Sequence, residues 1–156
     1  MRIGLISDTH GLLRPEAVRA LAGVERIIHA GDIGAPEVLQ GLRAVAPVHA
    51  VRGNNDVGAW AERLPHRLAL ELGGIRLEVL HDLKDLGVNS GSVDAGAGRP
   101  RVVISGHSHQ PSVTERDGVL FVNPGSAGRR RFKLPVTLGH LLVADGCARA
   151  EIRDLL

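Results

Sequence analysis

The start of the chain repeats one pattern that strongly limits the folds open to it, an apolar strand-like run followed by a helical segment. Short runs rich in Val, Leu, Ile and Ala occupy residues 2–7, 24–30 and 47–52. Pro15 and Pro36 open the two segments between them, and proline suits the first turn of a helix. This strand-helix-strand-helix-strand order predicts parallel strands joined by right-handed crossovers. The first third of the chain therefore indicates an α/β fold.

The remaining sequence carries the turn signals of antiparallel hairpins. Gly73-Gly74, Asp117-Gly118 and Asp145-Gly146 each separate two strand-like runs. We expect paired strands at residues 67–72 with 75–80, 112–116 with 119–122, and 135–143 with 147–153, and a buried strand at 101–105. Residues 89–98 are rich in Gly, Ser and Ala without helical periodicity, so we expect a loop across residues 83–98.

Length and composition predict one compact domain spanning residues 1–156, because 156 residues are too few for two ordinary domains. Aromatic residues make up only 2% of the chain, which argues against stacking platforms for single-stranded nucleic acid. The formal net charge is only +2, and the one basic cluster, Arg129 to Arg131, is better explained by a solvated turn. The sequence therefore carries no strong nucleic-acid signal.

The sequence favours a cytoplasmic location without a membrane partner. Residues 1–7 are too short for a signal-peptide apolar region before Asp8, and no apolar window approaches the length of a membrane span. The single cysteine, Cys147, cannot form an internal disulfide, which is compatible with a reducing compartment. Homo-oligomer formation stays open, because apolar surface residues cannot be separated from core residues by sequence.

Clusters of Asp, Asn and His follow the predicted strands at the points where those strands end. In an open α/β sheet, ligands bind outside the carboxyl ends of the strands, so residues distant in sequence can meet in one crevice. Seven side chains of metal-ligand type occupy such positions: Asp8, His10, Asp32, Asn54, His81, His107 and His109. Independent turn residues would not end so many apolar strands with metal ligands, and we predict a metal centre.

Other polar residues near these clusters are interpreted more modestly. An Asp or Asn after glycine usually forms a turn or caps a helix, and a lone histidine is usually a polar surface residue. Asp56 and Asp82 are therefore expected to support the site rather than bind metal. His29, just before Gly31-Asp32, could support a ligand in the same way.

The donor set indicates the kind of metal and the kind of chemistry. Carboxylate, amide and imidazole donors without thiolate disfavour a structural zinc site and suit Mn²⁺, Ni²⁺, Fe, Co²⁺ or catalytic Zn²⁺. Seven donors are too many for one small ion but suit two ions about 3.5–4 Å apart that share a bridging carboxylate. Such a pair activates water against a phosphate ester, so we predict a phosphoesterase.

The same residues resemble the calcineurin-like metallophosphoesterase family, whose pattern runs D-x-H, GD, GN, a histidine, and GHxH. Here the pattern reads Asp8-Thr9-His10, Gly31-Asp32, Gly53-Asn54, His81 and Gly106-His107-Ser108-His109. Asn123 to Ser126 also resembles a turn of the small prokaryotic phosphodiesterase branch. The resemblance implies a four-layer α/β/β/α sandwich with two mixed sheets.

The resemblance also implies a role for each ligand. Asp8, His10, Asp32 and His109 would hold a first ion, and Asp32 as bridge with Asn54, His81 and His107 would hold a second. Asp32, Asn54 and His10 would act directly in catalysis. The expected cofactor is a pair of divalent cations, with Mn²⁺ first and Ni²⁺ next, and the expected partner is a small phosphodiester substrate.

Two departures from the family pattern bear on activity. Many family phosphatases carry a histidine directly after the GN asparagine, and Asn55 at that position cannot act as a general acid. Such an acid contributes roughly 10²–10⁴ in rate, so we expect good leaving groups and a preference for phosphodiesters, with compensation by His10 or His29 left open. The loop at 83–98 and the surroundings of Trp60 are expected to set substrate specificity.

The alternative is a non-catalytic interaction scaffold. The same fold serves as the small subunit of the retromer coat, where metal-site residues are partly replaced. All seven positions of this chain keep competent ligand types, which favours an enzyme over an adaptor with a vestigial metal site.

Overall fold

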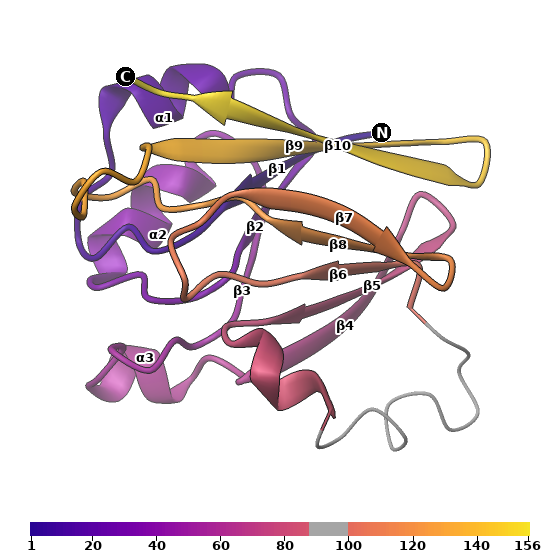
Figure 1. The fold of residues 1–156 in the computed structure, drawn as a ribbon. Coiled ribbons are helices and arrows are strands. Elements are labelled where there is room, and N and C mark those ends of the chain that lie inside the picture. Colours follow the sequence, from indigo (N-terminus) through magenta and orange to yellow (C-terminus); the bar gives the residue numbers. More distant parts are fainter. Residues whose placement is uncertain (88–99) are drawn as a thin grey trace.

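The structure is a computed structural model, and it describes residues 1–87 and 100–156. Two mixed sheets are stacked face to face in it (Figure 1), with strand orders β10-β9-β1-β2-β3 and β4-β5-β6-β8-β7. We call them the first sheet and the second sheet. Each combines the parallel strands and the antiparallel hairpins that the sequence indicates.

The first sheet contains the predicted parallel strands. Its members are β1 (Arg2–Ile6), β2 (Arg26–His29), β3 (Val48–Ala50), β9 (Thr137–Ala144) and β10 (Cys147–Asp154). Strands β1, β2 and β3 are parallel, whereas β9 pairs antiparallel with both β1 and β10. The predicted strand-helix-strand order and the last hairpin are both confirmed.

The second sheet is built around the other two predicted hairpins. Its members are β4 (Arg67–Leu72), β5 (Ile75–Leu80), β6 (Val102–Ile104), β7 (Ser112–Arg116) and β8 (Val119–Asn123). Strands β5, β6 and β8 are parallel, and β4 and β7 pair antiparallel at the two edges. The carboxyl ends of β5 and β6 therefore lie at one end of this sheet.

Helices α1 (Pro15–Ala20) and α2 (Pro36–Arg43) begin at the two prolines, as predicted, and cover the outer face of the first sheet (Figure 1). Their apolar residues, such as Ala17, Leu39 and Leu42, pack with Ile6 and Ile27 in one buried cluster. None of the described helices is long and apolar enough to cross a membrane.

Two short helical segments differ from the prediction. Helix α3 (Ala59–Glu62) has only four residues, too few to show helical periodicity in the sequence. The expected loop at 83–98 instead starts with the 3₁₀-helix η1 (Leu83–Asp85), because the Asp82 carboxylate accepts a hydrogen bond from the backbone N of Lys84. Leu86 then packs on the outer face of the second sheet against Leu80, Val103 and Val119. Residues 88–98 of the expected loop lie outside the described residues.

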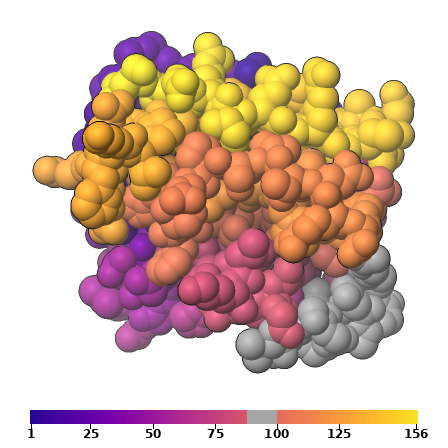
Figure 2. Space-filling model, viewed as in Figure 1, coloured from indigo at the N-terminus to yellow at the C-terminus, as the bar shows by residue number. Residues whose placement is uncertain are grey.

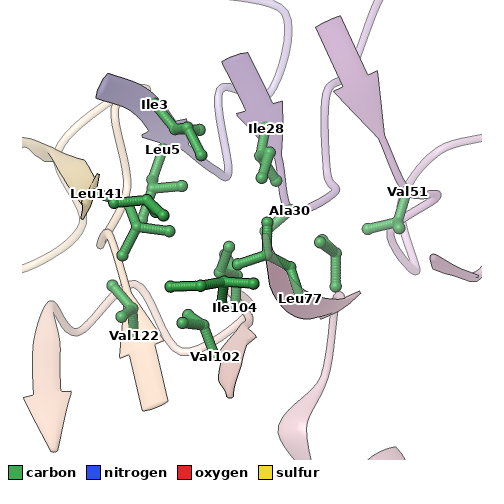
Figure 3. Close-up of a cluster of buried hydrophobic side chains, with 13 residues drawn as sticks. Ile3, Leu5, Ile28, Ala30, Val51, Leu77, Val102, Ile104, Val122 and Leu141 are labelled. Carbon is green, nitrogen blue, oxygen red and sulfur yellow. The ribbon is translucent and has the colours of Figure 1, made fainter. Parts of the chain in front are cut away.

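The main core lies between the two sheets (Figure 3). Ile3 and Leu5 of β1 meet Leu77 of β5 and Ile104 of β6 there, and all four side chains are fully buried. Because side chains alternate along a strand, Gly4 faces the helices instead. A Cβ atom at Gly4 would collide with the side chain of Leu21. The strand that carries the first predicted ligands is thus tightly packed on both faces.

His140 of β9 makes the stability of the fold sensitive to pH. Burial lowers the pKa of His140 below its usual value of 6.5, and its Nε2–H donates to the carbonyl of Ala20 at 2.8 Å. The folded protein therefore binds this proton less tightly than the unfolded chain, so its free energy of unfolding should fall as pH drops below 6.5 toward the folded pKa.

Chemical denaturation of the wild type and of His140→Gln between pH 5 and 8 checks this expectation, because glutamine keeps a donor but does not titrate. We expect the acid-induced loss to be smaller in His140→Gln. Equal losses in the two proteins would show that other groups are responsible.

Candidate metal centre

All seven predicted ligands follow strands at one end of the sandwich. Asp8 and His10 follow β1, Asp32 follows β2, Asn54 follows β3, His81 follows β5, and His107 and His109 follow β6. The first sheet contributes four of these residues and the second sheet contributes three. The structure thus brings together, across the sandwich, residues that are up to 101 positions apart, from Asp8 to His109.

Two groups of donor atoms share Asp8. The first group contains Asp8, His10 and His109, and the second contains Asp8, Asp32 and His81, with the donor atoms of each group within 4.8 Å of one another. Asp8 Oδ1 lies 3.3 Å from His109 Nε2, and Asp32 Oδ2 lies 3.3 Å from His81 Nε2. Two donors that each lie about 2.1 Å from a common ion are separated by about 3–4 Å, so these spacings suit shared cations.

Asn54 and His107 complete the cluster beside the second group. His107 Nδ1 lies 3.1 Å from Asn54 Oδ1 and 3.3 Å from His81 Nε2. His10 Nε2 lies 3.4 Å from His109 Nε2 and 3.8 Å from Asp32 Oδ2, which joins the two groups. Asp32 Oδ2 therefore lies between His10, which belongs to the first group, and His81, which belongs to the second.

The backbone of the site adopts conformations that residues other than glycine rarely take. Five of the seven residues have positive φ angles: Asp8 at 53°, His10 at 46°, Asp32 at 55°, His107 at 71° and His109 at 62°. Each such residue costs of order 1–3 kcal/mol and persists only where its surroundings enforce it. Strain concentrated on these residues indicates a functional arrangement rather than ordinary turns.

Glycines allow the loops to approach one another. A Cβ atom at Gly53 would overlap the backbone N and Oδ1 of Asp32, and one at Gly106 would overlap the Ser7 hydroxyl. A Cβ atom at Gly31 would lie 2.6 Å from His81 Nδ1. The glycine in each motif is therefore required by contact with a neighbouring motif.

Asp8 is held by one carboxylate oxygen and presents the other. Its Oδ2 accepts hydrogen bonds from the Ser7 hydroxyl at 2.6 Å and from the backbone N of His107 at 3.0 Å. Its Oδ1 is buried and has no hydrogen-bond partner among the described residues. An unpartnered carboxylate oxygen that faces histidine nitrogens is suited to a cation.

His81 is oriented so that Nε2 faces the carboxylates. Its Nδ1–H donates to the carbonyl of Ala30 at 2.8 Å, which leaves Nε2 free for a metal. Burial by itself would lower the pKa of His81, but contact with Asp32, the Ala30 hydrogen bond and the charge of Asp8 outweigh it and raise the pKa. The ring is thus drawn to the negative charge that a cation would otherwise neutralise.

Both carboxylates are ionised at neutral pH despite their burial. Burial would raise the pKa of Asp8, but the neighbouring His109 and the Ser7 hydroxyl lower it more. Burial would likewise raise the pKa of Asp32, but His81 and the two hydrogen bonds from Asn55 lower it well below its usual range. Asp8 and Asp32 are therefore competent ligands without further deprotonation.

Asn55 positions Asp32 rather than simply replacing a histidine. Its backbone N donates to Asp32 Oδ1 and its side-chain Nδ2 donates to Asp32 Oδ2, both at 2.9 Å. The family pattern predicts only that Asn55 lacks an acid function. The contact with both oxygens of Asp32 is visible only in the folded chain.

Asp56 supports the site as expected. Its carboxylate is buried and accepts hydrogen bonds from the backbone N of Gly34 at 2.9 Å and of Gly53 at 2.8 Å. It thereby ties the loop after β2 to the loop after β3. Asp82 also lies near a ligand, with Oδ2 at 3.6 Å from His107 Nε2.

His29 is a buried support and not a group that can reach a substrate. Burial lowers its pKa to about 4. Its Nδ1 accepts a hydrogen bond from the backbone N of Gly31 at 3.2 Å, and its Nε2 lies 3.0 Å from the Thr9 hydroxyl. Both ring nitrogens of His29 are thus occupied within the protein.

Two further residues hold the site and were not singled out by their chemistry. The Ser126 hydroxyl donates to the backbone carbonyl of Asp8 at 2.9 Å. Asn123 Nδ2 donates to the carbonyl of Gly106 at 3.0 Å and also contacts the Ser108 hydroxyl at 3.1 Å. Both belong to the Asn123-to-Ser126 turn, which was the sequence signal that could have found them.

Trp60 is partly exposed, and its expected role in substrate specificity stays a prediction. It packs against the buried cluster on the helix side of the first sheet. Arg129 to Arg131 are exposed, as a solvated turn requires.

Comparisons with known proteins identify the family of this chain. The sequence profile of the calcineurin-like phosphoesterase superfamily domain matches residues 1–146. A probable metallophosphoesterase of Methanothermobacter thermautotrophicus is 38% identical over 141 residues, which cover 81% of this chain and 77% of that protein. A phosphodiesterase of Methanocaldococcus jannaschii is 29% identical over 146 residues, which cover 80% of this chain and 83% of that protein.

Solved structures confirm the predicted fold. A novel archaeal phosphodiesterase is similar with a TM-score of 0.78 and 26% identity, covering 98% of this chain and 100% of that chain. Vps29 of Entamoeba histolytica, solved in complex with Zn²⁺, has a TM-score of 0.73 and 22% identity over 100% of both chains, and at that identity it shows the fold alone.

The family profile spans most of the chain, and the first of these relatives exceeds 30% identity over four fifths of it. The predicted resemblance is therefore confirmed, and the chain belongs to the calcineurin-like phosphoesterase superfamily.

Proposed function

We propose that the protein is a metal-dependent phosphodiesterase with a two-metal centre. The observation that carries the proposal is the convergence of five donor residues in two adjoining groups that share Asp8, with Asn54 and His107 beside the second group. Membership of a phosphoesterase family supports hydrolysis of phosphoric esters, and the named phosphodiesterase relatives favour diesters. The two-metal arrangement and the diester preference are the parts that experiments must test.

The residues present fit two cations. Asp8, His10, Asp32 and His109 would hold the first, and Asp32, Asn54, His81 and His107 the second. The donors are oxygen and nitrogen only, which suits Mn²⁺, Ni²⁺, Fe, Co²⁺ or Zn²⁺, with Mn²⁺ as our first choice. The unpartnered Oδ1 of Asp8 supports this assignment, because a cation would satisfy it.

The exposure of the ligands indicates the direction from which a substrate approaches. The side chains of Asp8 and Asp32 are 0% and 3% exposed, whereas those of His10 and His107 are 26% and 44% exposed. The two carboxylates thus form the floor of the site and the two histidines form its rim. A phosphate would enter between His10 and His107.

The chain's own residues position and orient the reaction. When bound, the cations lower the pKa of a water molecule and neutralise charge on the phosphate oxygens. Asp32, fixed at both oxygens by Asn55, keeps the two halves of the site together. Asn54 lines a hollow beside the second group and the His10 side chain is 26% exposed, and in this proposal both act directly on the substrate.

The expected preference for diesters with good leaving groups follows from the protein residues near the substrate. Asn55 is an amide whose donors are already directed at Asp32. His29 cannot compensate, because it is fully buried and holds Gly31 and Thr9. A leaving group that needs no proton is therefore favoured.

Substitution of Asn55 tests this explanation. We expect Asn55→His to change the rate of nitrophenolate release from an alkyl 4-nitrophenyl phosphodiester only slightly. It should raise the release of an alkoxide from a diester with a poorer leaving group by at least about 10-fold, because an imidazole can supply a proton. Asn55→Ala is the matched variant: it should not gain this activity and should weaken Mn²⁺ binding by about 10-fold, through loss of one hydrogen bond to Asp32. If Asn55→His gives no gain on the poorer substrate, the position does not limit the reaction.

The direct test of the proposed function combines metal analysis with two chromogenic esters. We expect the metal-free protein to bind two equivalents of Mn²⁺ and to hydrolyse bis(4-nitrophenyl) phosphate faster than 4-nitrophenyl phosphate. Binding of metal without hydrolysis of either ester would favour the scaffold. Faster hydrolysis of the monoester would overturn the diester preference but not the phosphoesterase.

A further inference from the structure

A hollow of about 410 Å³ adjoins the metal centre on the side of the second sheet. Its volume lies in the range of small-molecule sites. His107 and Asp82 line this hollow and also line a smaller one, of about 230 Å³, that contains Asn54 and His81. The two hollows therefore meet at the His107–Asp82 pair, directly beside the proposed second ion. A molecule bound at the metal centre could extend past this pair.

One wall of the larger hollow is a polar face of the edge strand β7. Ser112, Thr114 and Arg116 alternate along the strand and so point to the same side. Thr114 lies opposite Phe121 of β8, and Arg116 Cζ lies 4.6 Å from the centre of the Phe121 ring. Figure 2 shows this hairpin beside the η1 segment, which forms the opposite wall.

The wall runs outward from the metal centre. Ser112 pairs with Asn123, whose side chain contacts Ser108 next to His107. Arg116 lies at the other end of β7, four residues further along the strand. Because a strand rises about 3.3 Å per residue, the Cα atom of Arg116 lies roughly 13 Å beyond that of Ser112. Its guanidinium lies over Phe121, which is opposite Thr114, so the wall is long enough for a nucleotide-sized group.

The larger hollow also carries positive charge. Lys84 and Arg116 line it, and neither has an ion-pair partner among residues 1–87 and 100–156. The one carboxylate in the lining, Asp82, accepts a hydrogen bond from the backbone N of Lys84 and lies beside His107. The negative charge is thus near the metal centre, and the two cations are left for a ligand.

An exposed arginine on an edge strand is common and usually only solvated. Arg116 differs because the Phe121 ring fixes its guanidinium over a hollow instead of leaving it free in solvent. A fixed, planar guanidinium binds phosphate or carboxylate with two parallel hydrogen bonds. The hydroxyl groups of Ser112 and Thr114 supply further hydrogen-bond donors along the same wall.

We propose that this hollow binds one ester arm of the substrate, and that the preferred substrates are phosphodiesters whose arm carries a second anionic group. Arg116 and Lys84 bind that group while the scissile phosphate lies at the metal centre. Ser112 and Thr114 contact the sugar-sized part between the two charges. The inference rests on the proposed phosphodiesterase function and adds a substrate class to it.

Two esters that differ by one phosphate test the proposal. Thymidine 5′-(4-nitrophenyl phosphate) carries a single charge on its phosphodiester, and its 3′-phosphorylated form adds the second anion at the far end of the same arm. We expect the Mn²⁺-loaded protein to hydrolyse the 3′-phosphorylated ester with a kcat/KM at least about 10-fold higher. Both esters release the same nitrophenolate, so leaving-group chemistry cannot cause the difference.

Variants locate the effect. Arg116→Gln and Lys84→Gln should each reduce this preference severalfold, through a higher KM for the 3′-phosphorylated ester. Arg149→Gln on the exposed strand β10 is the matched control and should keep the full preference. Equal kcat/KM values for the two thymidine esters, or an unchanged preference in Arg116→Gln, would overturn the proposal.

A binding experiment separates this proposal from the proposed function. Calorimetry with thymidine 3′,5′-bisphosphate and thymidine 5′-monophosphate does not require turnover. Tighter binding of the bisphosphate, lost in Arg116→Gln, would support the arm site even if no ester were hydrolysed. Hydrolysis of bis(4-nitrophenyl) phosphate with no difference between the two nucleotides would leave the phosphodiesterase standing and refute the arm site.

Discussion

Asp8→Asn is expected to abolish Mn²⁺-dependent hydrolysis, with a loss in kcat of at least about 10³-fold, while the protein stays folded. Asparagine has nearly the shape of aspartate, and its amide oxygen can still accept the hydrogen bonds of Ser7 and of the His107 backbone N. Its NH₂ group would then replace Oδ1, which lies 3.3 Å from His109 Nε2 in one donor group and 4.0 Å from His81 Nε2 in the other. The site would lose a charge and a donor atom at its centre.

The measurement pairs kinetics with metal content and thermal unfolding. Asp154→Asn, at the exposed end of β10, changes the same chemical groups away from the site and should retain wild-type activity. His107→Ala should also lose activity, because the side chain belongs to the second proposed ion. Full activity in Asp8→Asn with normal metal content would contradict the assignment of Asp8.

Gly53→Ala is expected to abolish the binding of at least one of the two proposed metal ions and to lower the activity by at least about 10²-fold. The added Cβ would overlap the backbone N and Oδ1 of Asp32, and a backbone atom cannot move aside as the end of a flexible side chain does. The loops after β2 and β3 would have to separate. Asn54 would then move away from His107, which its Oδ1 now approaches to 3.1 Å.

Gly139→Ala in β9 is the matched control, because its Cβ would make only ordinary contacts, at 3.5 Å to Leu5 Cβ and 3.4 Å to the carbonyl of Glu151. Mn²⁺ titration and hydrolysis of bis(4-nitrophenyl) phosphate should distinguish the two variants. If Gly53→Ala bound two ions with wild-type affinity, close contact between these loops would not be needed for the site.

Much of this architecture could be predicted from local sequence signals. Pro15 and Pro36 mark real helix starts, and the Gly73-Gly74 and Asp117-Gly118 turns join the hairpins that were expected. These signals work because proline fixes φ and glycine permits turns regardless of distant contacts. The convergence of the seven polar residues could also be predicted, since parallel strands bring their carboxyl ends to one edge.

The rest depends on contacts that only the fold creates. Helix α3 is too short to have a periodic pattern, and η1 depends on a local cap by Asp82. Asn55 was interpreted by comparison with a missing histidine, because nothing in the sequence shows that both its donors reach Asp32. The packing of Trp60 against the helix-side core likewise depends on contacts between distant segments.

The division of the donors between the two sheets has a consequence for stability. Asp8, His10, Asp32 and Asn54 come from one sheet and His81, His107 and His109 from the other, so cations in this cluster would fasten the two halves of the sandwich at one end. Ligand binding to the native state alone adds about 2.7 kcal/mol of stability at one hundred times Kd. Removal of the cations by a chelator would therefore lower the free energy of unfolding as well as stop hydrolysis. The sheets would then be held together by apolar contacts such as those of Ile3 and Leu77, without the metal ligands that join them at one end.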